Sequence, residues 1–113
     1  EWIAKYGIRT AWGSDMLFSA RLAERQSQML THLGNFYSNA AALKMATSTN
    51  ADLLALSNER KPYPHKLGVI EPNAYADLLL VDGNPLEDLH LLDRPDEALA
   101  VIMKGGVAVK REI

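Results

Sequence analysis

The spacing of apolar residues changes about halfway along this chain, and no other feature limits the possible folds as strongly. In the first half the apolar positions recur at helical intervals, whereas in the second half they form short runs separated by glycine and proline. Residues 57–66, which connect the two parts, contain two prolines and several charges, and this indicates an exposed loop. The chain therefore combines a helical part with a strand-rich part, within a length that allows one domain or two smaller pieces.

The first residues predict the end of a helix followed by a strand. The large apolar side chains of residues 1–6 share one helical side, and Gly7 is suited to a left-handed helix stop. A helix this short is marginal in water and no capping residue precedes it, so we expect it to begin upstream in a longer protein. Residues 8–13 are β-prone and closed by glycine, which is typical of one step of an α/β barrel or doubly wound sheet. Asp15 would follow the carboxyl end of that strand.

Three helices are predicted over the remainder of the first half. Residues 18–33 carry an apolar stripe and end at Gly34, and residues 39–47 form a second helix capped by Ser38. Thr49 has the features of a cap for a short third helix. The residues that we expect these helices to bury are Phe18, Leu22, Met29, Leu30 and Leu33 from the first and Leu53, Leu54 and Leu56 from the third.

The second half predicts strands joined by tight turns. Strands are expected at residues 76–81, 99–103 and 107–110. The first of these is apolar on both faces, which predicts that it is buried. Gly105 and Gly106 form a favourable hairpin pair between the last two strands, and Asn73 after a proline tolerates the positive φ of a turn.

Composition and charge exclude several classes of function. The formal net charge is −2, and the longest basic run lies at the chain end, so we expect no nucleic-acid partner and no electrostatic attraction to a membrane. No apolar stretch approaches the roughly 20 residues that span a bilayer. The absence of cysteine excludes disulfides, thiolate zinc sites and cysteine nucleophiles. No secretory signal is visible, and the cytoplasm is the default location.

Several short sequence matches, taken together and in order, resemble the C-terminal part of the metal-dependent amidohydrolase superfamily. The matching strings are WGSD at residues 12–15, ALKMAT at 42–47, LGVIEP at 67–72, ADLLL at 76–80, NPLED at 84–88 and VIMKGG at 101–106. Each string is weakly specific, but their joint order is specific and covers nearly the whole chain. The sequence looks most similar to the imidazolonepropionase-like and prolidase-like branch, whose members hydrolyse cyclic amides or peptide and acyl bonds.

The resemblance implies an α/β fold and a division of the chain into two parts. Residues 1–60 would be a remnant of a (β/α)₈ TIM barrel, comprising a helix end, the eighth strand and the closing helices. Residues 61–113 would supply strands of the small β-sandwich, or composite, domain. The missing N-terminal portion of the barrel would then be this chain's partner in the parent enzyme, together with a small-molecule or peptide substrate.

On this resemblance Asp15 is both a metal ligand and the catalytic residue of a zinc-dependent hydrolase. A carboxylate at the carboxyl end of a barrel strand points into the active-site mouth, where it can ligate zinc and act as general base for the attacking water. Without the resemblance, such a residue after a strand is most often a turn or helix cap. The parent would hold one or two zinc ions, but a catalytic zinc needs about three protein ligands. We therefore expect this chain alone to bind no stoichiometric zinc and to be inactive.

The other polar residues favour structural interpretations. His32 near a helix end, His65 among prolines and His90 after an acidic stretch are not spaced as metal ligands. Asp77, before a buried strand, is expected to hydrogen-bond to nearby backbone. Ser14 has no histidine placed by sequence to activate it. The acidic residues expected on a solvated face are Glu87, Asp88, Asp93, Asp96 and Glu97.

Two further functions remain open at the level of sequence. The chain could be a non-catalytic interaction module derived from the same fold, because a barrel piece without its neighbours exposes strand flanks and apolar helix faces. Such surfaces favour a homo-oligomer, or a packing in which residues 8–13 do not sit as in a barrel. Alternatively, the parent could be a deaminase of cyclic amidines or nucleobases, because the small domain is shared widely.

Overall fold

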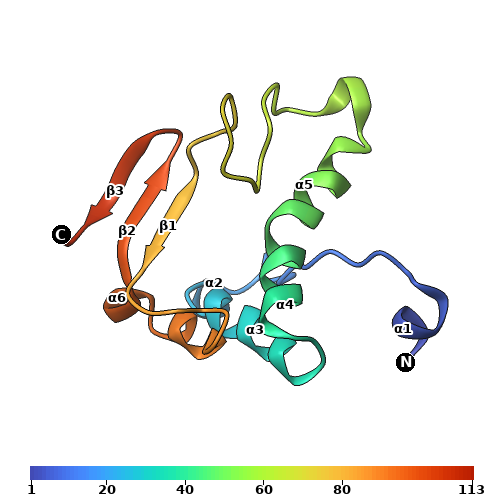
Figure 1. Cartoon of the computed structure of the whole chain (residues 1–113), viewed down its shortest axis with the longest axis horizontal. Coiled ribbons are helices and arrows are strands. Elements are labelled where there is room, and N and C mark those ends of the chain that lie inside the picture. Colours follow the sequence, from blue (N-terminus) through green and yellow to red (C-terminus); the bar gives the residue numbers. More distant parts are fainter.

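The fold is described from a computed structural model that covers all residues, 1–113. The helical elements are α1 (Trp2–Tyr6), α2 (Ala20–Ala23), α3 (Gln26–Thr31), the 3₁₀ turn η1 (His32–Asn35), α4 (Asn39–Ala46), α5 (Ser48–Ala55), η2 (Asn58–Arg60), η3 (Leu89–Asp93) and α6 (Pro95–Ala98). The strands are β1 (Leu78–Val81), β2 (Leu99–Lys104) and β3 (Val107–Arg111). Figure 1 shows the sheet and the α4–α5 pair on opposite sides, with α1 lying apart at the end of an extended segment.

The predicted helix caps are partly confirmed. Ser38 caps α4, and its hydroxyl accepts a hydrogen bond from the backbone N–H of Ala41 at 3.3 Å. The cap predicted at Thr49 is wrong, because α5 begins at Ser48 directly after a sharp bend at Thr47, with φ −120° and ψ −97°. The Thr47 hydroxyl caps nothing and instead donates to the Leu43 carbonyl at 2.7 Å. The two helices are therefore one helical arm with a joint at Thr47.

The single helix predicted over residues 18–33 is divided into α2 and α3. Ser19 caps α2 by accepting from the Leu22 N–H, so the helix starts after Phe18, whose side chain is 96% exposed. Helical structure also continues as η1 beyond Gly34, where the sequence predicted its end. The part of the stripe nearest η1 behaves as expected, because Leu30 and Leu33 pack against the core.

The strand predicted over residues 8–13 is not formed. A strand exists only where a neighbour accepts and donates its backbone hydrogen bonds. None of the three strands pairs with residues 8–13, which run extended and unpaired between α1 and α2. The helix end before this segment is confirmed, because Gly7 adopts the left-handed conformation at φ 59°.

The three strands form one antiparallel sheet in the order β1-β2-β3. Gly105 and Gly106 both have positive φ, 56° and 82°, which confirms the predicted hairpin turn. Asn73 also has positive φ, at 66°, in a turn closed by a hydrogen bond from Ala74 to the Glu71 carbonyl. The predicted burial of the first strand is wrong in this chain, because two of its leucines are more than half exposed (Leu79 and Leu80).

The small core lies where the helices meet the sheet. Its buried residues are Ala42, Leu89, Leu92 and Leu99, with Leu30, Leu33, Leu43, Val81 and Ile102 packed against them. These residues come from both halves of the chain, so the helical and strand-rich parts share one core. The division at residues 60 and 61 falls in the exposed connection and stays a prediction.

Much apolar surface is left uncovered. The accessible surface of the chain is 8587 Å², whereas a compact monomer of 12.5 kDa exposes about 6,200 Å². The three leucines of the α5 region that were expected in the core are exposed, at 55%, 44% and 63% (Leu53, Leu54 and Leu56). Their burial would need a surface that this chain does not provide. No helix combines the length and apolar character needed to cross a bilayer.

Candidate functional site

Asp15 lies on the extended segment between α1 and α2, and its side chain is exposed. Its backbone adopts positive φ, 51°, a conformation that aspartate tolerates better than most residues. The carboxylate takes part in none of the five ion pairs of the chain. The Asp15 carboxylate is therefore exposed and has no ion-pair partner within the chain.

The segment before Asp15 is attached to the joint between α4 and α5. The Trp12 N–H points at two acceptors, the Met45 carbonyl at 3.3 Å and the Asn50 side-chain oxygen at 3.1 Å. Arg9 adds an ion pair with Asp52 at 3.7 Å, but both side chains are about two-thirds exposed, so the pair contributes little. The joint in the helical arm thus holds the backbone at Trp12, three residues before Asp15.

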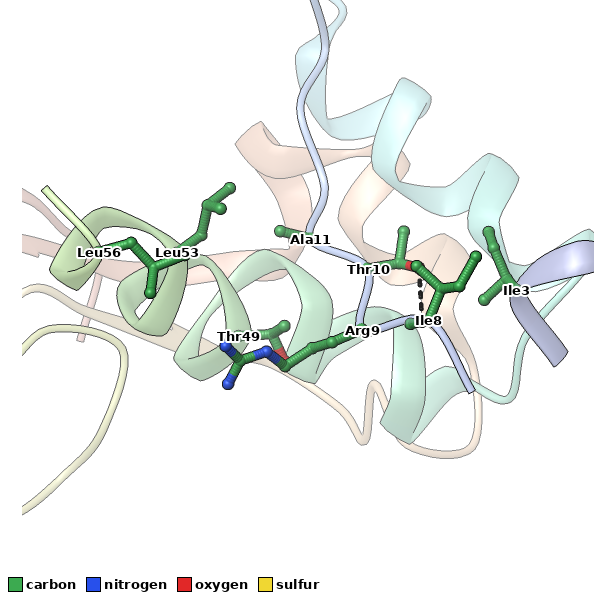
Figure 2. Close-up of a pocket in the computed structure, with 8 residues that line it drawn as sticks. All are labelled: Ile3, Ile8, Arg9, Thr10, Ala11, Thr49, Leu53 and Leu56. Atoms are coloured by element: carbon green, nitrogen blue, oxygen red, sulfur yellow. Dashed lines mark hydrogen bonds between the residues drawn. The ribbon is translucent and has the colours of Figure 1, made fainter. Parts of the chain in front are cut away.

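An open apolar cleft lies beside this segment, on the side of α5. Its volume is about 590 Å³, and it is lined by Ile3, Ile8, Arg9, Thr10, Ala11, Thr49, Leu53 and Leu56. Figure 2 shows the extended segment along one wall and α5 along the other, with the Thr10 hydroxyl donating to the Ile8 carbonyl at 3.1 Å. Asp15 does not line the cleft, so the carboxylate and this cavity are separate features.

The residues of this chain do not build a metal centre. No three histidine, aspartate or glutamate side chains come together in a way that could hold an ion. Asp15 can contribute one carboxylate oxygen, and a catalytic zinc needs about three protein ligands. A zinc site at Asp15 would need ligands that other chain segments supply.

None of the three histidines forms a hydrogen bond or an ion pair with Asp15. His32 is exposed on η1, and His65 packs edge-on against the Tyr75 ring with centroids 5.5 Å apart. His90 on η3 pairs with Asp93 through its Nδ1 atom at 2.8 Å. His32 and His90 both lie near Asp93, whereas His65 lies against an aromatic ring, and no three ligand-type side chains come together around any of them.

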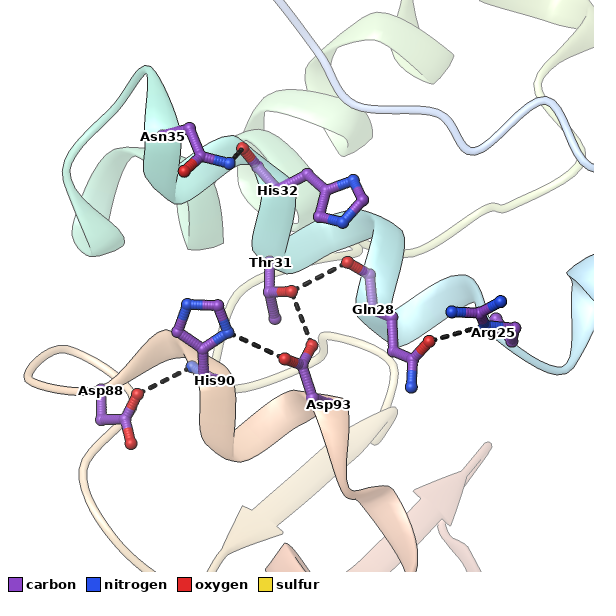
Figure 3. A network of polar contacts seen from close by, with 8 residues as sticks. All are labelled: Arg25, Gln28, Thr31, His32, Asn35, Asp88, His90 and Asp93. Atoms are coloured by element: carbon purple, nitrogen blue, oxygen red, sulfur yellow. Dashed lines mark hydrogen bonds and ion pairs between the residues drawn. The ribbon is translucent and has the colours of Figure 1, made fainter.

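A polar network joins α3 to η3 and was not predicted from the sequence. Figure 3 shows Asp93 between two partners: the Thr31 hydroxyl donates to one carboxylate oxygen at 2.6 Å, and His90 contacts the other. Thr31 is only 2% exposed, whereas Asp93 was expected on a solvated face. The spacing of His90 and Asp93 by three residues, one helical turn, was the available signal for this pair.

The network shifts the pKa values of both ionisable partners. The hydrogen bond that the His90 ring donates to Asp93, together with the negative charge of Asp93, raises the pKa of His90 above 6.5, and the charge of Asp88 adds to this. Burial works to raise the pKa of Asp93, but hydrogen bonds from Thr31 and His90 and the charges of His90 and His32 outweigh it and lower that pKa below 3.8. The pair is therefore ionised together in weakly acidic solution.

Asp77 has the structural role predicted from its position. Its carboxylate accepts a hydrogen bond from the Gly105 N–H at 2.6 Å, while the neighbouring Ala76 carbonyl accepts from Gly106 at 3.0 Å. These two bonds hold the hairpin turn against the start of β1. Asp88 likewise acts locally, because its side chain caps η3 through the His90 N–H at 2.9 Å.

Comparison with known proteins identifies the family. The model of the amidohydrolase family matches residues 1–108. A crystal structure of an amidohydrolase has 31% sequence identity and a TM-score of 0.79, over 98% of this chain and 25% of that chain. A prolidase crystallised with N-methylphosphonate-L-proline has 30% identity and a TM-score of 0.77, over 96% of this chain and 24% of that one. No curated protein gives a significant match. This chain spans about a quarter of the length of the solved structures that it matches, and it belongs to the amidohydrolase family.

Proposed function

We propose that this chain is part of a longer zinc-dependent hydrolase that cleaves amide-type C–N bonds. The observation that carries the proposal is the amidohydrolase family match, which extends over residues 1–108 and therefore includes Asp15. The structural similarity to a prolidase, crystallised with a phosphonate derivative of proline, favours substrates in which the cleaved amide lies next to a carboxylate-bearing residue. The (β/α)₈ barrel and the composite sandwich belong to this proposal.

Asp15 is the residue of this chain that would act in the reaction. A zinc ion in the parent would supply Lewis-acid activation of the water and the carbonyl group. The carboxylate of Asp15 can take a proton from the attacking water and return it to the leaving nitrogen. Its exposure and its lack of an ion pair within the chain are consistent with this role, because both leave its oxygens free for outside partners.

The proposal is tested by comparing the 113-residue chain with the longer protein that contains it. We expect the longer protein to hydrolyse dipeptides or N-acyl amino acids, to lose activity on chelation and to regain it with zinc. We expect the chain alone to bind less than one zinc per molecule and to hydrolyse none of these substrates, because it offers one carboxylate at the site. One tightly held zinc on the isolated chain, or a longer protein indifferent to chelation, would contradict the proposal.

A second candidate function is self-association, and the exposed apolar surface favours it. The cleft leucines Leu53 and Leu56 are 55% and 63% exposed, and the chain presents about 2,400 Å² more surface than a compact monomer of its mass. This excess is ample for a stable interface, which buries about 800 Å² on each partner. The chain alone would then be a homo-oligomer.

Sedimentation over a range of concentrations tests this second function. We expect the chain to be larger than a monomer, and we expect Leu53→Glu with Leu56→Glu to shift it to a monomer that stays folded, since both side chains are exposed within one chain. The control is Leu79→Glu with Leu80→Glu, which introduces the same charge at two similarly exposed leucines on the sheet. A chain that stays monomeric at high concentration would show that it does not self-associate.

A further inference from the structure

The joint between α4 and α5 presents two acceptors to one donor on the segment that carries Asp15. Because the arm bends at Thr47, the Met45 carbonyl at the end of α4 and the Asn50 side chain in the first turn of α5 both reach the Trp12 N–H. Asn50 also donates through its Nδ2 to the Ala46 carbonyl at 3.4 Å, which orients the carboxamide with its oxygen toward Trp12. The side chain thus bridges the joint and the extended segment.

This attachment is the main polar link between residues 9–18 and the rest of the molecule. Within that segment, the Trp12 N–H is the one backbone group that hydrogen-bonds to another element. The Arg9–Asp52 ion pair is the other connection, and it is largely exposed. Three residues span at most about 10 Å, so a fixed Trp12 restricts where the Asp15 carboxylate can lie.

Gly68, from the second half of the chain, packs closely against the backbone of the joint at Thr47. Its backbone lies so close to the bend that a Cβ there would come within 2.5 Å of the Thr47 carbonyl carbon and 2.8 Å of the Ser48 nitrogen. Only glycine allows this approach, and its φ of +69° is also unfavourable for other residues. The bend that brings Met45 and Asn50 to Trp12 is therefore supported by a segment that lies far away in sequence.

From these contacts we infer that Asn50 is a positioning residue for Asp15, acting through the Trp12 N–H. The inference rests on the proposed function, in which Asp15 is the catalytic carboxylate. Asn50 does not touch the reacting groups, and its role is to fix the backbone three residues before them. Loss of its side-chain oxygen would let the turn drift, and a displacement of about 1 Å at a catalytic group can lower turnover by roughly a hundredfold.

The first arm of the test measures amide hydrogen exchange at Trp12 in the 113-residue chain. Asn50→Leu removes the acceptor at similar volume, and Asn50→Asp keeps an acceptor oxygen but loses the donor to the Ala46 carbonyl. Asn39→Leu is the matched control, because Asn39 also makes a long-range side-chain hydrogen bond, to the Leu86 carbonyl at 3.1 Å, but none to Trp12. We expect exchange at Trp12 to quicken roughly fivefold in Asn50→Leu, the effect of losing one ordinary hydrogen bond, and to return in part in Asn50→Asp.

Exchange at the buried Ala42, in the middle of α4, separates a local effect from unfolding. Faster exchange at Trp12 alone supports the inference. Equal exchange at Trp12 in Asn50→Leu and Asn39→Leu overturns it, and so does a loss of protection that extends to Ala42, because Asn50 would then support the fold as a whole.

The second arm measures turnover in the longer protein. We expect Asn50→Leu to lower kcat about tenfold to a hundredfold with little change in KM, and Asn50→Asp to restore part of the lost turnover. The two proposals fail separately. If Asp15→Asn leaves turnover intact, the proposed function is wrong, whatever the exchange at Trp12 shows. If Asp15→Asn abolishes turnover and Asn50→Leu behaves like Asn39→Leu, the positioning role alone is wrong.

Discussion

Hydrogen bonds between single side chains connect the two halves of the chain, and they involve Thr31 from the first half and Asp93 and His90 from the second. The buried Thr31 hydroxyl fixes one oxygen of Asp93, and the other oxygen faces the exposed His90 ring. The bond from Thr31 joins α3 to η3 beside the apolar core, so the carboxylate belongs to the packing of the two elements rather than to the solvent. A charged group held in this way makes the stability of the contact depend on pH.

The directions of the two pKa shifts determine how the stability of this contact changes with pH. The pKa of His90 is raised, so its contribution is complete below about pH 6.5 and is lost as the pH rises through the folded value. The pKa of Asp93 is lowered, so its contribution is present above pH 3.8 and is lost as the pH falls through the folded value. We expect the network to stabilise the chain most between these limits.

Urea unfolding at a series of pH values measures the effect. We expect the wild-type midpoint to fall modestly from about pH 6 to about pH 9, because the exposed His90 loses its charge, and His90→Gln to remove that fall. His65→Gln is the control, since His65 contacts the Tyr75 ring and has no carboxylate hydrogen bond, and it should keep the wild-type profile. Identical profiles for His90→Gln and wild type would show that the pair contributes nothing to stability.

At the scale of elements, the sequence predicted helix caps and turns that depend on neighbouring residues. It did not predict strand pairing and helix bending that depend on residues distant in sequence. Ser38 caps α4 and the paired glycines Gly105 and Gly106 turn the hairpin, because these effects act within a few residues. Residues 8–13 have the composition of a strand, but a strand needs a partner, and none lies beside them. The bend at Thr47 was missed because Gly68 supports it from 21 positions away.

The close approach at Gly68 predicts a large effect from a single methyl group. Gly68→Ala should lower the free energy of unfolding by about 2 kcal/mol or more, because the Cβ meets backbone atoms of Thr47 and Ser48 that cannot move aside without opening the joint. Gly105→Ala is the matched control: φ is +56° and nothing lies within 4 Å, so only backbone strain of about 1 kcal/mol applies. Chemical denaturation of both variants gives the comparison, and equal losses would mean that the contact with the joint carries no cost.

For the whole molecule, the sequence predicted the family but not the extent of burial, and the catalytic role of Asp15 stays a prediction. The order of short motifs along the chain was sufficient for the amidohydrolase assignment, which the family match confirms. The sequence predicted that apolar residues such as Leu53 and Leu79 are buried in the core, but both are exposed. Their burial would depend on surfaces that the chain itself does not supply. The same limit applies to Asp15: its neighbours in a metal site would come from elsewhere, so the sequence gives its chemistry but no surrounding geometry.

Turnover by the Asp15→Asn variant of the longer protein is the most direct test of Asp15 as the catalytic carboxylate. We expect kcat/KM to fall about a thousandfold, because an amide can neither accept the proton of the water nor return it to the leaving nitrogen. Asp77→Asn is the control at a carboxylate that holds a hairpin turn, and it keeps the acceptor oxygen for the Gly105 N–H, so its turnover should stay within about twofold of wild type. If Asp15→Asn turns over as fast as Asp77→Asn, Asp15 is not the catalytic carboxylate.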